Sequence, residues 1–178
     1  MTEIPLFLDF EASSLEAASY PIQVAWSDAA GQIESWYLNP YCVDDWTDWD
    51  FHAQQAVHGI SRAFLREEGK HPRFVAERMN AALAWQTAYV TGWDFDRMWC
   101  ARLLVAAGLE ATFELGNYWQ LFPDEYLQFG EDGRQHIESL AEEAWRRTPG
   151  RRHDAAVDVL QMIELYRMVV EQSKPGGR

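Results

Sequence analysis

The pattern of hydrophobic positions predicts that the chain opens with three strands. Residues Ile4–Phe10 (IPLFLDF) are almost continuously apolar, which is typical of a strand buried on both faces in the middle of a sheet. Two more strand candidates, Pro21–Ser27 and Gln32–Leu38, are separated by the turn residues Asp28–Gly31. This arrangement predicts an antiparallel hairpin beside the first strand.

The middle of the chain predicts a loop followed by helices. Residues 39–50 are rich in Asp and Trp and predict a loop. Residues 52–69 favour two short helical pieces that are split at Gly59, with Ser61 as the N-cap of the second piece. Helical periodicity then covers Arg73–Trp85.

The second half of the chain indicates strands in alternation with helices. The pattern predicts a short strand over Ala88–Gly92 and a helix over Asp94–Ala107 directly after it. A fifth strand is expected at Thr112–Leu115, and further helices at His136–Trp145 and Asp154–Val170. Such alternation after an antiparallel start predicts an α/β fold with a mixed sheet.

Length and composition favour one globular domain. The chain has 178 residues, of which 48% are hydrophobic and 24% charged, close to the globular average. We expect a single domain over residues 1–172 and a frayed tail over residues 173–178. The two cysteines are too few for a disulfide framework or a structural zinc site. No apolar run approaches the ~20 residues that span a bilayer, and the N-terminus lacks the basic region of a signal peptide, so we expect a cytoplasmic protein without a membrane partner.

The net charge restricts the class of nucleic-acid partner. The chain has 15 Lys and Arg residues against 28 Asp and Glu residues, a formal net charge of -13. Such a surface repels polyanions and argues against tight, non-specific binding to long duplex DNA. It remains compatible with an enzyme that acts on a short nucleic-acid end, where metal ions supply the positive charge.

Two carboxylates separated by one residue lie at the end of the first predicted strand. Asp9 and Glu11 leave the same face, about 7 Å apart, because a strand has a period of two residues. Burying two like charges side by side is costly unless something neutralises them, and a divalent cation between them would do so. The alternative is a strand that ends at Leu8, with both acids in solvent.

A third carboxylate is predicted near the fourth strand. Asp96 follows that strand and lies in the first turn of a helix, where an Asp also suits the helix dipole. Asp94, two residues earlier, is a candidate N-cap. Because α/β sheets place ligands at the carboxyl ends of their strands, Asp96 is in a position to converge with Asp9 and Glu11.

A histidine and a fourth carboxylate flank the start of the last predicted helix. His153 and Asp158 belong to the segment HDAAVD, and the small pair Ala155–Ala156 would let this helix approach a sheet closely. The alternative is a histidine that precedes an Asp154 N-cap, together with a surface Asp158. Each of these signals is weak by itself, and their conjunction is informative.

The order and spacing of these groups resembles the DEDDh group of 3′–5′ exonucleases. The matching features are D-x-E in the first strand, an Asp after the fourth strand, and His153 five residues before Asp158. The segment Val57–Ser61 (VHGIS) looks like the HGI segment that these enzymes place near the terminal nucleotide. The resemblance covers residues 4–170 and implies a ribonuclease H-like fold with helices that flank a central mixed five-stranded sheet.

The resemblance also implies a two-metal mechanism. Two divalent cations, Mg²⁺ or Mn²⁺, would be held by Asp9, Glu11, Asp96 and Asp158, since these cations prefer oxygen ligands. His153 would be the general base that takes a proton from the attacking water. The implied activity removes nucleoside 5′-monophosphates from the 3′ ends of single-stranded RNA or DNA, and a homodimer is left open.

Six further residues are candidates to hold the terminal nucleotide: Phe10, Ser13, Ser14, Leu15, His58 and Ile60. For each of them, a place in a turn or in the core is the competing interpretation. In three places the sequence departs from the family pattern: Ala12–Leu15 replaces the usual Thr-Thr-Gly, Gly92–Asp94 stands where Asn is common, and Asp154 stands where Arg is common. These changes leave the metal ligands intact, but they let Asp94 compete with its neighbour for the ligand role.

The main basic cluster precedes the proposed base. Residues 146–152 (RRTPGRR) contain four arginines and a Pro-Gly turn. We expect Arg151 and Arg152 to grip backbone phosphates of the substrate. The competing interpretation is that the first two arginines complement a helix C-terminus and that the rest of the loop is solvated.

Two other functions stay open on the sequence. An oligoribonuclease-like enzyme that degrades very short RNA is favoured by the acidic charge and the compact length. A catalytically inactive ribonuclease H-like module that binds a partner is the alternative from another class, although all five catalytic residue types are present.

Overall fold

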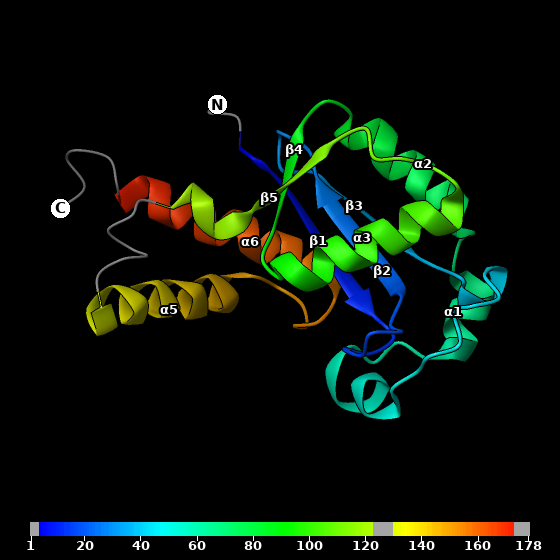
Figure 1. Ribbon diagram of the computed structural model, residues 1–178. Coiled ribbons are helices and arrows are strands. Elements are labelled where there is room, and N and C mark those ends of the chain that lie inside the picture. The colour runs from blue at the N-terminus through cyan, green and yellow to red at the C-terminus, as the bar shows by residue number, and fades with distance from the viewer. Residues whose placement is uncertain (1–3, 123–129, 173–178) are drawn as a thin grey trace.

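The computed structural model describes residues 4–122 and 130–172, and their centre is a five-stranded sheet (Figure 1). The strands are β1 (Leu6–Ala12), β2 (Pro21–Ser27), β3 (Ile33–Tyr37), β4 (Thr87–Val90) and β5 (Glu114–Asn117). Their order is β3-β2-β1-β4-β5, with antiparallel pairing from β1 to β3 and parallel pairing from β1 through β4 to β5. The mixed sheet is therefore confirmed. The predicted tail, residues 173–178, lies outside the described residues.

Helices surround this sheet. The longer ones are α1 (Arg62–Glu68), α2 (Pro72–Leu83), α3 (Trp93–Ala107), α5 (Gly130–Arg147) and α6 (Ala155–Gln172), and helical turns lie at η1 (Pro40–Cys42), η2 (Ala53–Val57) and η3 (Tyr118–Leu121). The N-cap predicted for α1 is confirmed, because Ser61 Oγ accepts a hydrogen bond from the Phe64 N–H at 3.1 Å. Within the described residues, no helix has the length and apolar character needed to cross a membrane.

The helices cover both faces of the sheet. α2 and α3 lie over one face, and α5 and α6 lie over the other (Figure 1). Buried side chains of β1 alternate between the two cores, with Leu8 and Phe10 under α2 and α3, and Phe7 under α6. Burial on both sides explains the almost continuous apolar run at this point of the sequence.

β1 continues beyond its predicted end. The strand runs to Ala12 because its ladder with β2 continues, although the register shifts between Glu11 and Ala12. The alternative in which the strand ends at Leu8 is therefore wrong. Asp9 and Glu11 are strand residues on the face that meets α6, and each is 8% exposed.

Other element boundaries also differ from the prediction: β4 ends at Val90 rather than Gly92, and α5 begins at Gly130 rather than His136. Two more differences lie near Trp85. The helix expected over Arg73–Trp85 ends at Leu83, and the strand expected at Thr112–Leu115 is shifted into β5. Trp85 explains both differences: its φ of 64° cannot continue a helix, and its N–H donates to the Thr112 carbonyl at 2.8 Å. This bond ties the start of β4 to the residues before β5.

Gln23 of β2 is a buried polar residue that fixes the start of α6. It lies opposite Glu11 in the β1–β2 ladder and is 2% exposed. Its Nε2 donates to Oδ1 of Asp154 at 3.1 Å, and its Oε1 accepts from the Ala155 N–H at 3.3 Å. The sheet thereby holds the N-terminal end of α6 beside the end of β1.

Replacing Gln23 with Leu should destabilise the protein by about 1–3 kcal/mol, because the Ala155 N–H and the Asp154 carboxylate lose a buried partner. Urea unfolding followed by circular dichroism measures this change. The control is Gln32→Leu, which changes an exposed side chain. Equal stability of the two variants would show that Gln23 does not hold α6.

Candidate active site

One cavity of about 370 Å³ is lined by the four carboxylates and the histidine that the sequence singles out, and also by Asp50, His52 and His58. Asp9 and Glu11 come from β1, and Asp96 and Asp158 come from the first turns of α3 and α6. His153 lies in the loop directly before α6. The cavity lies at the carboxyl ends of β1 and β4, the edge at which α/β sheets bind ligands. The structure thus brings together the five side chains that the sequence singles out.

The start of α3 places Asp96 in the cavity. Gly92 precedes the helix, and its N–H donates to Oδ2 of Asp96 at 2.9 Å. A Cβ at Gly92 would lie 3.0 Å from the same oxygen, so the close approach favours glycine. Asp94 is exposed in the same turn and is not among the residues that line the cavity. The N-cap predicted at Asp94 is wrong, because Gly92 occupies that position.

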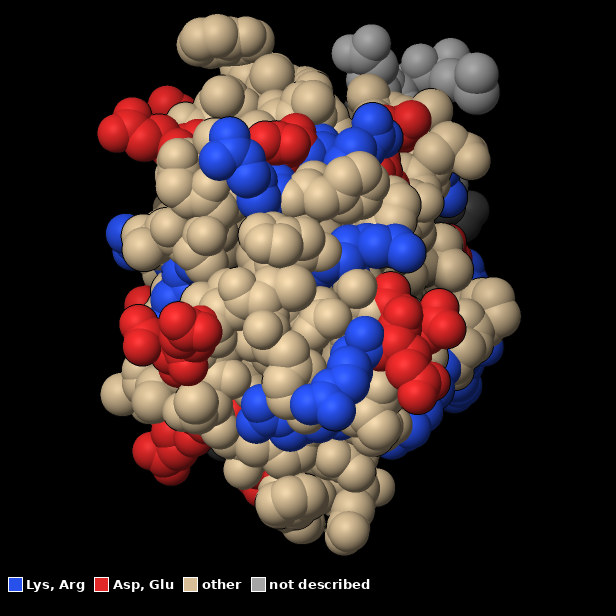
Figure 2. Space-filling model, turned by 90° about the vertical axis from the view of Figure 1, so that its right-hand side faces the viewer, with Lys and Arg blue, Asp and Glu red and all other residues tan. Residues whose placement is uncertain are grey.

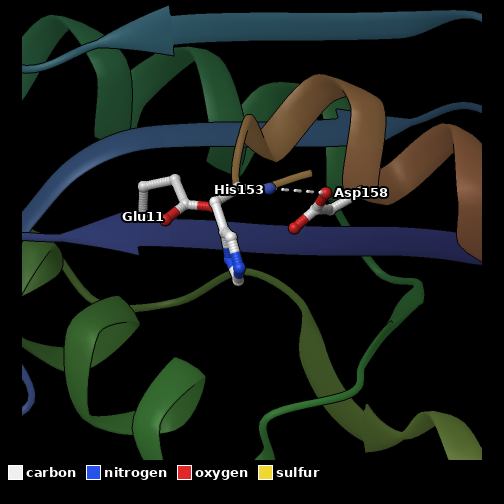
Figure 3. A group of neighbouring side chains, drawn as sticks. All are labelled: Glu11, His153 and Asp158. Carbon is white, nitrogen blue, oxygen red and sulfur yellow. Dashed lines mark hydrogen bonds between the residues drawn. The ribbon is translucent and has the colours of Figure 1, made fainter. Parts of the chain in front are cut away.

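The loop before α6 places His153 beside Asp158. The φ of His153 is 63°, a left-handed conformation that few non-glycine residues adopt, and its N–H donates to Oδ1 of Asp158 at 3.2 Å. Asp154 caps the helix, since its Oδ1 accepts from the Ala156 N–H at 3.0 Å. Figure 3 shows Glu11, His153 and Asp158, and their potential ligand atoms all lie within 4.8 Å of one another.

Burial raises the pKa of every carboxyl group in this cluster. The pKa of Glu11 rises to about 8, that of Asp96 to about 7 and that of Asp158 to about 6. The pKa of Asp9 also lies well above its ordinary value, first through burial and then through the charges of the neighbouring carboxylates. Its Oδ2 atom is buried and has no hydrogen-bond partner among the described residues.

A divalent cation fits this donor set. The cluster offers carboxylate oxygens, one of them without a hydrogen-bond partner in the described part of the chain, and oxygen is the ligand that Mg²⁺ and Mn²⁺ prefer. Among the described residues that line the cavity there is no lysine or arginine. A bound cation would therefore supply a positive charge that the walls of the cavity lack.

Replacing Glu11 with Gln should stabilise the metal-free protein, and the gain should grow with pH. Folding raises the pKa of the Glu11 carboxyl from 4.5 to about 8. The folded protein therefore loses stability as the pH rises through this range, whereas a glutamine at this position does not ionise. Urea unfolding in EDTA should show little difference from the parent at about pH 5 and a gain of a few kcal/mol at about pH 9. The exposed control is Glu67→Gln. A gain for Glu11→Gln that is independent of pH would contradict the electrostatic origin.

His58 adds a hydrogen-bond donor to the cavity. Its Nδ1 accepts from the Ile60 N–H at 3.0 Å, so the neutral ring carries its proton on Nε2. That nitrogen is buried without a hydrogen-bond partner among the described residues, and the side chain lines the cavity. Burial, with a smaller contribution from Arg151, lowers the pKa of His58 to about 4. His58 is therefore neutral near pH 7 and has an N–H available to a ligand.

The other candidate nucleotide contacts separate into two groups. Phe10, Ser14 and Leu15 line the cavity, and Leu15 is 71% exposed. Ser13 and Ile60 lie behind it. Ser13 Oγ accepts from the Tyr20 N–H at 3.1 Å, and Ile60 belongs to the core under α2 and α3.

Sequence reasoning assigned no role in the site to two aromatic residues that line the cavity. Phe95 and Trp99 stack with ring centroids 5.4 Å apart, and Phe95 is 40% exposed. Their spacing of four residues on α3 is a signal that the sequence contains. The part played by Gln23 was also missed, although a polar residue in the apolar strand PIQVAWS is a comparable signal.

Three of the four arginines in the basic cluster before His153 form ion pairs with glutamates. Arg146 and Arg147 both pair with Glu143, at 2.6 and 2.9 Å. Arg152 donates to both carboxylate oxygens of Glu142 at 3.0 Å. These pairs explain why three of the four arginines add little net charge to the surface near the cavity.

The comparisons with known proteins support the fold. No protein-family model and no curated protein matches the chain. Among solved structures, E. coli exonuclease I in complex with a 5cy-dT13 oligonucleotide is similar, with a TM-score of 0.65 and 18% identity over 98% of this chain and 42% of that one. The zinc-bound complex of E. coli exonuclease I with single-stranded DNA has a TM-score of 0.62 and 16% identity, over 99% of this chain and 42% of that one.

A third structure, the complex of E. coli exonuclease I with a dA16 oligonucleotide, has a TM-score of 0.61 and 17% identity over 94% of this chain and 41% of that one. The likeness confirms the ribonuclease H-like fold that the DEDDh resemblance implies. The chain spans about two fifths of the length of these structures.

Proposed function

We propose that the chain is a metal-dependent 3′–5′ exonuclease that hydrolyses the terminal phosphodiester of single-stranded RNA or DNA and releases nucleoside 5′-monophosphates. The observation that carries this proposal is the convergence of Asp9, Glu11, Asp96, His153 and Asp158 on one cavity. The fold shared with oligonucleotide complexes of exonuclease I supports a single-stranded substrate.

The four carboxylates would hold two divalent cations, Mg²⁺ or Mn²⁺. When bound, such ions neutralise the scissile phosphate and favour ionisation of the attacking water. The part played by the chain is to gather Asp9, Glu11, Asp96 and Asp158 in a buried place where each side chain lacks a cationic partner in the cavity wall. The unpartnered Oδ2 of Asp9 and the raised pKa values of the cluster support this assignment.

His153 would take the proton from the attacking water. Its ring lies beside the carboxylates of Glu11 and Asp158, whose charges would stabilise the imidazolium that forms. The hydrogen bond from its backbone to Asp158 holds the residue in its left-handed conformation. Imidazole exchanges protons near neutral pH, which suits this role.

The terminal nucleotide would lie in the same cavity as the carboxylates, against its apolar side chains. Leu15 and Phe95 offer exposed apolar surface for the base, and His58 offers an N–H for an acceptor on the sugar or phosphate. Phe10 and Ser14 would complete this wall, with Ser13 and Ile60 supporting it from behind. A mostly apolar lining with a few polar groups is typical of sites that bind small ligands.

Degradation of labelled strands tests the proposal. With Mn²⁺, the protein should shorten a 5′-labelled single strand stepwise from its 3′ end, and excess EDTA should stop the reaction. Asp96→Asn should lower the rate by more than about 100-fold, since even residues that support metal ligands cost 10–100-fold when they are lost. Asp94→Asn, in the same helical turn, is the matched control and should remain within about threefold of the parent. A larger loss for Asp94→Asn would reverse the ligand assignment.

The same labelled strands, followed for both binding and shortening, separate the competing functions. Strands that are bound without being shortened would favour an inactive binding module. Cleavage confined to the shortest RNA would favour an oligoribonuclease-like enzyme, which the acidic charge also suits.

His153→Asn should lower kcat by roughly 10²–10⁴-fold, the contribution typical of a general base. Asparagine tolerates the left-handed backbone at this position, so the loop should keep its shape. The thermal shift on addition of Mn²⁺ should persist in the variant, because the four carboxylates remain. Near-normal turnover by this variant would show that another group takes the proton.

A further inference from the structure

Arg151 differs from the other arginines of its cluster. Its Nη2 donates to the Val57 carbonyl at 2.6 Å, which joins the loop before α6 to the end of η2. The guanidinium lies directly against Gly59, where a Cβ would collide with it and where the φ of 72° also favours glycine. Arg151 thereby holds a defined position on the side of the cavity formed by Val57 and His58.

The charge of Arg151 acts on two residues that line the cavity, Glu11 and His58. It lowers the pKa of Glu11 and that of His58, although burial outweighs this influence at Glu11. No carboxylate of the described residues lies within 4.0 Å of its guanidinium, and its hydrogen bond to Val57 uses one of five N–H groups. Arg151 is therefore an oriented cation with donors to spare at the edge of an acidic cavity.

The neighbouring arginines have other partners. Arg152 also lowers the pKa of Asp158, but Glu142 holds its guanidinium, which lies 4.7 Å from the ring centroid of Trp145. On the face of the molecule that carries α1, basic side chains form separate patches between acidic ones, and no continuous basic track crosses the described part of that face (Figure 2). Neither Arg152 nor the basic patches on this face provide a continuous positive surface along which a long polyanion could bind.

We propose that Arg151 binds one substrate phosphate, the one next to the scissile phosphodiester, and that this contact marks the end of the phosphate-binding track. This inference rests on the proposed exonuclease function, in which the carboxylate cluster takes the scissile phosphate. The cleft then engages the last three nucleotides of a strand, because a dinucleotide has one phosphodiester and a trinucleotide has two. Arg151 is a specificity-determining residue that sets the shortest well-bound substrate.

Binding measured by fluorescence anisotropy in Ca²⁺ tests this inference, with labelled single strands of two, three and ten nucleotides. A charge-assisted contact predicts that the trinucleotide binds about tenfold more tightly than the dinucleotide, and that the ten-mer gains little more. Arg151→Ala should remove the gain of the trinucleotide and reduce the slope of log K against log salt by about 0.7. Arg151→Lys should restore part of the gain. The matched control, Arg146→Ala, should retain it in full, because Glu143 already pairs with this arginine.

A second test changes the substrate and uses the parent protein: one phosphate of the trinucleotide is replaced by a neutral linkage. A trinucleotide with a methylphosphonate at its inner linkage should bind the parent protein like a dinucleotide, and Arg151→Ala should not weaken it further. Equal losses for Arg151→Ala and Arg146→Ala, unchanged binding of the neutral trinucleotide, or a ten-mer that binds far more tightly than the trinucleotide would each overturn the inference. Failure of the parent to cleave any strand in Mn²⁺ would instead reject the proposed exonuclease, and the binding measurements would still decide the role of Arg151.

Discussion

The cost of burying four carboxylates in one place is the constraint on which the rest of this structure depends. Asp9 and Glu11 lie in a strand that is buried on both faces, and Asp96 and Asp158 approach them from two helices. Burial raises the pKa values of all four groups, and repulsion from neighbouring carboxylates adds to this at Asp9 and Glu11, so the folded protein retains an arrangement that is unfavourable without a counter-charge. This arrangement supports the divalent-cation site that we propose.

The surrounding scaffold holds the carboxylates together against that repulsion. Gln23 ties the start of α6 to β2, and the bond from the His153 backbone fixes Asp158. The N–H of Gly92 does the same for Asp96. The donors in these contacts are backbone N–H groups and one amide side chain, which carry no charge, although Asp154, which accepts from Gln23, adds a negative charge that raises the pKa of Glu11 and Asp158. A positive charge lies beside the cavity at Arg151, where it lowers the pKa of Glu11 and bonds the Val57 carbonyl.

Periodicity and local chemistry were sufficient to predict most of the fold. The apolar run around Phe7 and Leu8 indicated a central strand, and the Ser61 N-cap was recognised from its residue type. The boundaries were less accurate, because they depend on partners distant in sequence. Trp85 ends its helix through a bond to Thr112, and no local pattern reveals that pairing. The pairs of Arg146 and Arg147 with Glu143, by contrast, span three and four residues of one helix and are a local signal that the sequence contains.

By itself, the sequence determined the mixed α/β sheet and the types and spacing of the five groups in the cavity, because strand and helix periods and chain order are local properties. The tertiary structure decided which of two nearby aspartates enters the cavity, since the turn at Gly92 directs Asp96 inward and leaves Asp94 in solvent. It also decided which arginine has donors to spare at the edge of the cavity. Both outcomes depend on where side chains meet after the chain has folded, and sequence spacing does not specify those distances.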